Sequence, residues 1–302
     1  MRFLVCLFVF CVVTVRNVHG QEPTPKAGQH ASQPAASESV LRLDNLLAWC
    51  IVPFDSARRS PAARAKMLRE LGIVRCAYDW RAEHVKDFEE EIVQYRQHGI
   101  EYFAFWGGHE EAYRLFEKHD LHPQIWRTLS DYSSGKKNVP PTPEPSGQEK
   151  LNSAVAGILP LVTRTKELGC KLGLYNHGGW GGEPQNMVAV CRRLRQLGHQ
   201  HVGIVYNFHH GHANVSNWQQ SLDAMLPYLL CINLNGMNDN GDPKILGIGK
   251  GQYEQEMIQA ILQSDYRGPI GILDHRPEMD ARESLQENLS GLDALRQTLK
   301  AK

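Results

Sequence analysis

The 302-residue chain has no excess of charge of either sign, and its five cysteines after residue 20 show no CxxC spacing. Its 33 Lys and Arg balance 33 Asp and Glu, so it lacks the basic surplus with which nucleic-acid-binding proteins neutralise phosphates. It also has no HExxH sequence and no glycine-rich phosphate loop after a strand-like run. These absences disfavour a nucleic-acid repair enzyme and a nucleotide-binding open sheet.

Long apolar runs are also missing after the N-terminus. The only one, Phe3–Val15, follows Arg2 and precedes Val18-His19-Gly20, the pattern of a secretory signal peptide over residues 1–20. The run is shorter than the roughly 20 residues of a membrane span, so an uncleaved anchor is the less favoured alternative. The sequence therefore predicts an exported protein, periplasmic or secreted, with no stable membrane span after signal cleavage.

Residues 21–40 are rich in Pro, Ala, Ser and Gln, a composition that cannot bury enough apolar surface to fold. We interpret them as a disordered linker, followed by a single domain over residues 41–302. Five cysteines follow the predicted signal, an odd number without paired spacing. Cys50, Cys76 and Cys231 fall inside predicted strands, where a thiol behaves as a small buried apolar group. We predict no disulfide.

Strand-like and helix-like segments alternate along the domain, which predicts an α/β fold. Apolar, strand-length runs occur at Leu46–Val52, Val74–Tyr78, Tyr102–Trp106, Gln124–Thr128, Lys171–Asn176, Val202–Asn207, Leu229–Leu234 and Ile270–Leu273. Helical periodicity covers Pro61–Leu71, Val85–Gln97, Glu110–His119, Leu151–Leu168, Pro184–Leu197, Asn217–Leu226, Tyr253–Leu262 and Leu285–Leu299. Eight such pairs in about 250 residues indicate a single (β/α)8 TIM barrel. A doubly wound open sheet is the alternative. The segment Asp131–Gly147, dense in Pro, Ser and Gly, is expected to be a long loop.

Polar residues gather where the predicted strands end. The sixth run leads into Asn207, His209, His210 and His212, and the fifth into Asn176 and His177. The seventh gives Asn233 and Asn235, and the eighth gives Asp274 and His275. In TIM barrels the active site lies at the carboxyl ends of the strands, so these residues are the candidates for one.

The same stretches resemble the xylose isomerase-like superfamily of barrels, which includes sugar isomerases and epimerases and apurinic-endonuclease-like proteins. The resemblance covers almost the whole domain. It is carried by LGLYNHGGW, VYNFHHGHA, LGIGKGQYE and YRGPIGILDH. It implies a divalent metal held by a Glu, an Asp, a His and a Glu on strands five to eight, with a His three residues after the Asp assisting.

Placed on this sequence, the implied ligand positions fall on Asn176, Asn207, Asn233 (or Asn235) and Asp274, and the assisting histidine falls on His210. Three of the four are amides, whereas divalent cations prefer carboxylate, imidazole or thiolate donors. The resemblance therefore implies a degenerate site. Only the resemblance implies a divalent metal as cofactor. The candidate ligands for such a metal, all weak, are His210, Asp274 and His212.

Period-two alternation along a strand puts each of the four ligand positions on one face with its second neighbours. We expect Asn176, Asn207, Asn233 and Asp274 to point into the barrel near its open mouth. There each amide can donate to and accept from hydroxyl or carbonyl groups of a small ligand. A mutually satisfied polar layer without a ligand is the alternative.

We predict His210, His177 and Asp274 as catalytic residues that converge at the mouth, with imidazole as general base or acid. His209, His275, Trp180 and Arg127 are predicted to contact the substrate, together with Asn235 and the other amides. Asp274 can alternatively form a plain salt bridge with Arg127. The other tryptophans are expected to serve packing.

Lys244 and Lys250 lie in the loop before the seventh helix and can reach an acidic substrate, although solvated loop lysines are commoner. Two functions remain open. One is a carbohydrate isomerase, epimerase or lyase that transfers a proton next to a carbonyl. The other is a carbohydrate-binding barrel without catalysis.

Overall fold

The computed structural model describes residues 38–129 and 146–300. The predicted signal peptide, most of the predicted linker and most of the predicted loop Asp131–Gly147 lie outside the described residues. Glu38–Leu41, at the end of the predicted linker, forms a 3-10 helix, and Val40 is buried against the core. No helix in the described ranges is long and apolar enough to cross a membrane.

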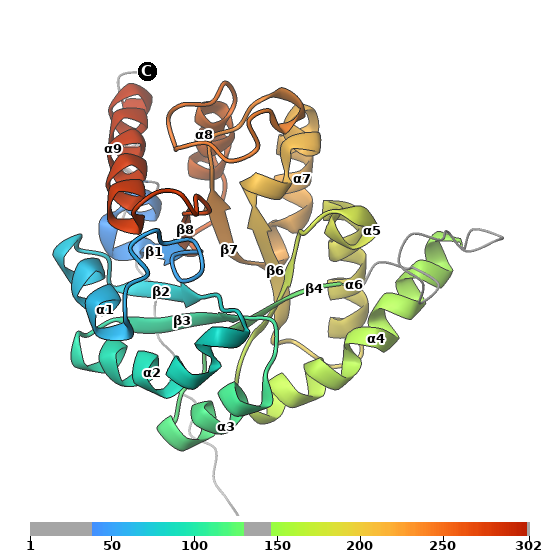
Figure 1. Ribbon diagram of the computed structural model, residues 1–302. Helices are drawn as coiled ribbons and strands as arrows, with labels where there is room; N and C mark the ends of the chain where they lie inside the picture. The colour runs from blue at the N-terminus through green and yellow to red at the C-terminus, as the bar shows by residue number, and fades with distance from the viewer. Residues whose placement is uncertain (1–37, 130–145, 301–302) are drawn as a thin grey trace, which may run out of the picture. The chain divides into compact units, whose positions relative to one another are not determined.

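Eight parallel strands close into a barrel in the order of the sequence, which confirms the predicted fold (Figure 1). The strands are β1 Leu46–Trp49, β2 Arg75–Tyr78, β3 Glu101–Trp106, β4 Gln124–Thr128, β5 Leu172–Tyr175, β6 Val202–Asn207, β7 Leu229–Leu234 and β8 Ile270–Leu273. β1 is shorter than predicted because the chain turns at Cys50, which has a φ of 63°. This turn places Cys50 at the end of the strand rather than inside it.

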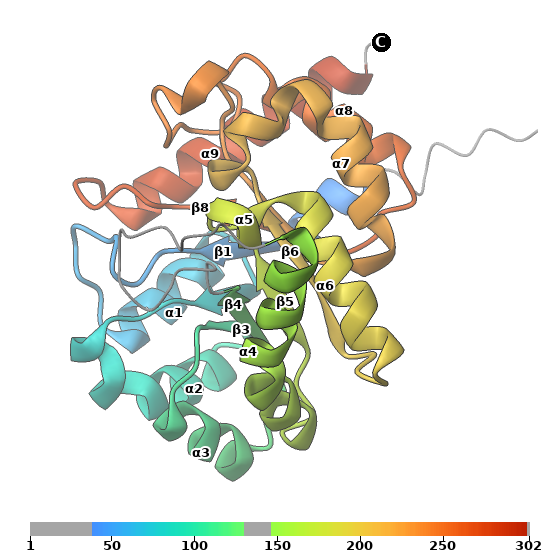
Figure 2. The same ribbon diagram turned by 90° about the vertical axis from the view of Figure 1, so that its right-hand side faces the viewer.

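Helices surround the strands in both views of the ribbon (Figures 1 and 2). They are α1 Pro61–Glu70, α2 Phe88–Gln97, α3 Glu110–His119, α4 Gly147–Glu167, α5 Gly179–Gly182, α6 Pro184–Gln196, α7 Trp218–Met225, α8 Glu254–Gln263 and α9 Ala281–Lys300. Gly72, Gly99, Gly169 and Gly198 follow four of them at positive φ, as glycine caps should. The short α5 was not predicted. α4 begins earlier than predicted because Ser146 and Glu149 form a capping box at its start.

The apolar core has two layers. The inner layer draws on all eight strands and on no helix, so it fills the barrel; it contains Leu47, Trp49, Ala77, Ala104, Trp126, Tyr175, Val205, Cys231 and Leu273. The outer layer joins the other strand face to the helices and includes Leu172, Leu174, Ile270 and Ile272. The five cysteines in the described ranges are all buried free thiols.

This division corrects two of the predicted orientations. On β5 the inward positions are Tyr175 and Gly173, and on β8 they are Leu273 and Gly271. Because side chains alternate along a strand, Asn176 and Asp274 share the outward face with Leu174 and Ile272. The predicted alternation of side chains along the strands is correct. Alternation alone does not show which strand face points into the barrel, because both faces of a strand in a parallel barrel are apolar.

The barrel interior is filled closely around Gly271, which gives a stability prediction. A Cβ at Gly271 would lie 1.7 Å from Asn233 Oδ1, so Gly271→Ala should lower the free energy of unfolding by about 1–3 kcal/mol. Gly157→Ala on the exposed side of α4 meets nothing within 4 Å and should raise it by about 0.5–1 kcal/mol. Urea unfolding of both variants checks this. Equal stabilities would contradict the packing described.

Candidate active site

A cavity of ≈ 450 Å³ opens among the carboxyl ends of the strands. Its walls come from segments far apart in the sequence, namely Trp49, Cys50, Phe54, Asp79, Arg81, Trp106, Tyr175, His177, Asn207, His209, His210, Lys244, Ile245, Leu273 and His275. The position agrees with the rule for active sites in TIM barrels. The volume lies in the range of small-molecule sites.

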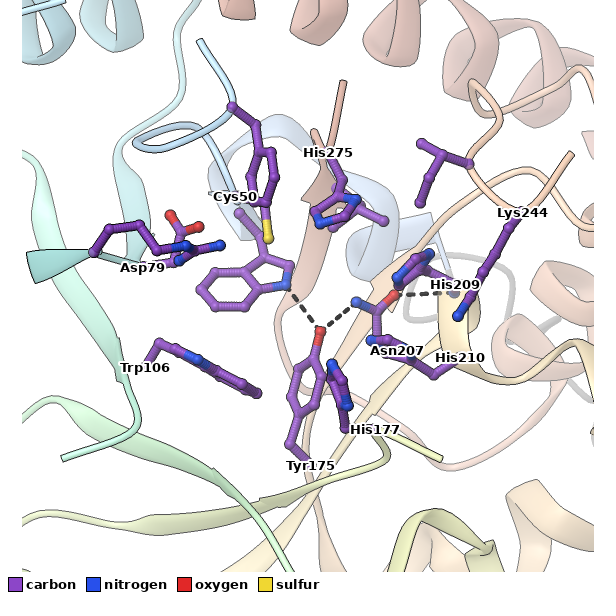
Figure 3. Close-up of a pocket in the computed structure, with 15 residues that line it drawn as sticks. Cys50, Asp79, Trp106, Tyr175, His177, Asn207, His209, His210, Lys244 and His275 are labelled. Carbon is purple, nitrogen blue, oxygen red and sulfur yellow. Dashed lines mark hydrogen bonds between the residues drawn. The ribbon is translucent and has the colours of Figure 1, made fainter. Parts of the chain in front are cut away.

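The hydroxyl group of Tyr175 lies in the middle of this cavity wall (Figure 3). It accepts a hydrogen bond from Trp49 Nε1 at 3.0 Å and another from Asn207 Nδ2. Both lone pairs of the phenol oxygen are thereby used, so its own proton is left to donate. Burial raises the pKa of Tyr175, which keeps that proton in place and makes the group a neutral hydrogen-bond donor.

Asn207 is the one predicted amide that lines the cavity. Its Oδ1 accepts from the backbone N–H of His209 at 3.1 Å. Asn176 instead fastens the neighbouring strand ends, because it donates to the Asn207 carbonyl at 2.9 Å and accepts from the Asn207 N–H at 2.7 Å. The predicted amide ring is therefore wrong for Asn176, whose role is structural.

The two amides of β7 do not line the cavity either. Asn233 is fully buried and accepts from the Cys231 thiol at 3.6 Å. Asn235 is buried beneath the following loop, where it donates to the Lys244 carbonyl at 3.0 Å and accepts from the Leu246 N–H at 3.2 Å. Asn235 therefore positions a loop instead of contacting substrate as predicted.

Four predicted histidines form a continuous row along one side of the cavity (Figure 3). The ring centroids of His177 and His210 are 4.4 Å apart, those of His210 and His209 are 4.0 Å apart, and those of His209 and His275 are 5.2 Å apart. The four histidines follow three different strands, and the structure brings their rings together.

The inner part of this row is uncharged. Burial, aided by neighbouring imidazoles and by Lys244, lowers the pKa of His209 to about 3 and that of His210 to about 2. Burial also lowers the pKa of His275. An efficient general base has a pKa near the working pH, so His210 is a poor base and acts better as a neutral hydrogen-bonding group. His177 is solvent-exposed at the outer end of the row.

Asp79 was not among the predicted site residues, yet it is the carboxyl group of this cavity. It follows β2 and is 3% exposed. Among the described residues no ion pair within 4.0 Å holds its carboxyl group, and the polar groups that interact with it include the Val52 backbone and the Cys50 thiol. Burial raises the pKa of Asp79 to about 7, against the opposing charge of Arg81. A charged residue one position past an apolar strand was the available signal. Figure 3 shows Asp79 across the cavity from His209, His210 and Lys244.

Asp274 does not converge with His177 and His210 as predicted. Its carboxyl group accepts from the Ser284 hydroxyl of α9 at 2.7 Å, which follows from its outward position on β8. Burial raises its pKa to about 7 as well, but the side chain does not line the cavity. Nor does it pair with Arg127; the nearest cation is Arg276, at 4.0 Å.

Three further predicted residues lie away from the described cavity wall. Trp180 packs partly buried against the outer core, and Arg127 is exposed on β4. The Nδ1 of His212 lies 2.9 Å from the Asn238 carbonyl oxygen and its Nε2 lies 3.1 Å from that of Lys244, and the nitrogen that carries the proton donates to its carbonyl, so His212 packs under the loop after β7. In place of Trp180, Trp49 and Trp106 supply the aromatic surface of the cavity.

The divalent metal implied by the resemblance does not fit these residues. The implied ligands that point inward are Asn207 and Asn233, both neutral amides, and the carboxyl group of Asp274 is turned to α9. Within residues 38–129 and 146–300, no three His, Cys, Asp or Glu side chains converge as metal ligands. Amide oxygens are weak neutral donors, so no metal is assigned here.

Comparisons with known proteins support the fold. No family model matches the chain, and no curated protein matches it. Solved structures do match. The 3-keto-D-glucoside 4-epimerase of E. coli is 14% identical with a TM-score of 0.61, over 84% of this chain and 99% of that one.

Two others are comparable. The IolI protein with a bound zinc atom is 14% identical with a TM-score of 0.62, over 84% of this chain and 98% of that one. A xylose isomerase domain protein from Planctomyces limnophilus is 12% identical with a TM-score of 0.60, over 86% and 100%. Together with the closed eight-stranded barrel, these similarities establish that the chain has the xylose isomerase-like TIM-barrel fold.

Proposed function

We propose that this protein is an enzyme that transfers a proton at a carbon next to a carbonyl group of a carbohydrate, as in isomerisation, epimerisation or elimination. The observation that carries the proposal is Asp79, a buried carboxyl group that has no ion pair with a described residue and faces a row of imidazoles across the cavity. A group with a pKa of about 7 can both give and take a proton at neutral pH.

Each wall of the cavity has a separate role in this proposal. Asp79 acts as one acid or base, and His177, in contact with solvent at the outer end of the row, acts as the other. The Tyr175 hydroxyl donates to the substrate oxygen on which negative charge develops, which a fixed neutral donor stabilises. Asn207 and His210 hold hydroxyl groups, and Trp49 and Trp106 offer flat faces to a sugar ring.

The class of substrate is supported by analogy. Structures of similar fold include a 3-keto-D-glucoside 4-epimerase, a D-psicose 3-epimerase and a probable 3-DHS dehydratase. Fold alone does not determine chemistry, so the site residues carry the argument. From the N-terminal sequence we also propose that the protein is exported.

Two buried aspartates allow a matched test of the catalytic assignment. Both have a pKa raised to about 7, but Asp79 faces the cavity and Asp274 faces α9. Incubation in D2O with a panel of monosaccharides and sugar acids, followed by proton NMR, should reveal exchange at a carbon beside the carbonyl. Asp79→Asn should slow that exchange by about 10²- to 10⁴-fold, whereas Asp274→Asn should stay within a few fold.

Equal losses in the two variants would contradict the assignment of Asp79. Carbohydrates that raise the melting temperature but never exchange would instead support a binding protein without catalysis.

The protonation of Asp79 can be tested without a substrate. Between pH 4 and 7 the group is protonated in the folded state and ionised in the unfolded one, so the wild type loses stability as pH rises through this range. Asp79→Asn lacks this loss. Its free energy of unfolding relative to the wild type should therefore increase by about 4 kcal/mol from pH 4 to pH 8.

Urea unfolding at both pH values measures this difference, with the exposed Asp223→Asn of α7 as control. A difference for Asp79→Asn that does not change with pH would show that its carboxyl group is ionised throughout.

A further inference from the structure

Two cationic side chains line the cavity, and neither has a carboxylate of the described residues within 4.0 Å. Lys244 comes from the loop after β7, and Arg81 follows β2. Arg81 donates to the Trp80 carbonyl at 2.7 Å and lies 5.2 Å from the centre of the Phe54 ring. By contrast, Lys250 on the same loop as Lys244 pairs with Glu287 at 2.8 Å.

Two side chains, one buried and one half-buried, hold the backbone of Lys244 in place. Its carbonyl accepts from Asn235 Nδ2 at 3.0 Å and lies 3.1 Å from His212 Nε2. The next turn of the loop is fixed as well, because the Leu246 N–H donates to Asn235 Oδ1 at 3.2 Å. Lys244 is itself exposed to solvent, but its side chain lines the cavity from a backbone that is held in place.

The charges around the cavity do not balance. Asp79 is the one carboxyl group among the described residues that line it, and Arg81 lies on the same side, directly after β2. Arg81 offsets Asp79 when that carboxyl group is ionised. Lys244, beside His209 and His210 in Figure 3, then remains as one uncompensated positive charge. One monoanionic group on the ligand would neutralise it.

The remaining wall fits the rest of such a ligand. The Tyr175 hydroxyl, Asn207 and the imidazoles offer neutral hydrogen bonds to hydroxyl groups, and Trp49 and Trp106 offer apolar surface. A volume of ≈ 450 Å³ accommodates a single monosaccharide unit. A phosphate dianion is usually bound by more positive charge and by several backbone N–H groups. The described residues of the cavity wall do not supply these.

Building on the proposed function, we propose that the substrate is a monosaccharide acid whose carboxylate pairs with Lys244. The reacting carbon then lies between Asp79 and His177 in the same cavity. The proposal concerns binding and is therefore separable from the chemistry.

Calorimetric titration of the full chain with matched pairs tests it, using D-glucuronate against D-glucose, D-galacturonate against D-galactose and D-gluconate against D-glucitol. At least one acid should bind ten-fold or more tightly than its neutral partner, with an affinity that falls as salt is added. Lys244→Gln should abolish this preference. Lys250→Gln, which removes the same charge from the same loop outside the cavity, should keep it.

Several results would overturn the proposal. These are equal binding of acids and neutral sugars, an unchanged preference in Lys244→Gln, tighter binding of glucose 6-phosphate than of any acid, or no binding of any compound in the set. Exchange of a neutral sugar in D2O would overturn it while leaving the proposed function intact. An acid that binds through Lys244 but shows no hydrogen exchange in D2O would contradict the proposed function and leave the proposed binding of acids intact.

Discussion

The mouth of the barrel depends on one hydroxyl group, that of Tyr175. By accepting from the Trp49 indole and the Asn207 amide, it joins β1, β5 and β6 at the cavity wall. Asn176 then locks β5 to β6 through both of its amide atoms. A buried phenol with both lone pairs occupied has only its proton left to offer. The centre of the site is therefore a fixed, neutral donor.

This arrangement decides the electrostatics around it. Amides, indoles and imidazoles with lowered pKa surround the hydroxyl, so the inner cavity carries little charge of its own. An ionisable group buried there without an ion pair among the described residues, such as Asp79, has its pKa driven toward neutrality by desolvation. The same desolvation that makes His210 a weak base thus makes Asp79 an effective acid or base. Charge enters the cavity at its rim, through Lys244 and Arg81.

The sequence predicted the barrel and the gathering of histidines because strand spacing and strand ends are local properties. It did not predict which face of β5 and β8 points inward, since both faces of a parallel barrel strand are apolar. Because of this orientation, Tyr175 points inward on β5 in place of Asn176. At the end of β8, Leu273 and His275 point inward in place of Asp274. Asp79 and Asp274 each follow an apolar strand, but Asp79 shares the inward face with Ala77, whereas Asp274 lies on the outward face against α9. The protonation of buried groups depends on surroundings that no local pattern contains.

The most direct test of this account is the metal content of the protein purified without chelator. Mass spectrometry of the elements should be carried out before and after dialysis against zinc or manganese and then against metal-free buffer. Well under one metal ion per chain is expected in both samples, because no three His, Cys, Asp or Glu side chains of the described residues converge as metal ligands and amides bind divalent ions weakly. One ion per chain that survives dialysis in the wild type and is lost in Asn207→Ala would contradict the account.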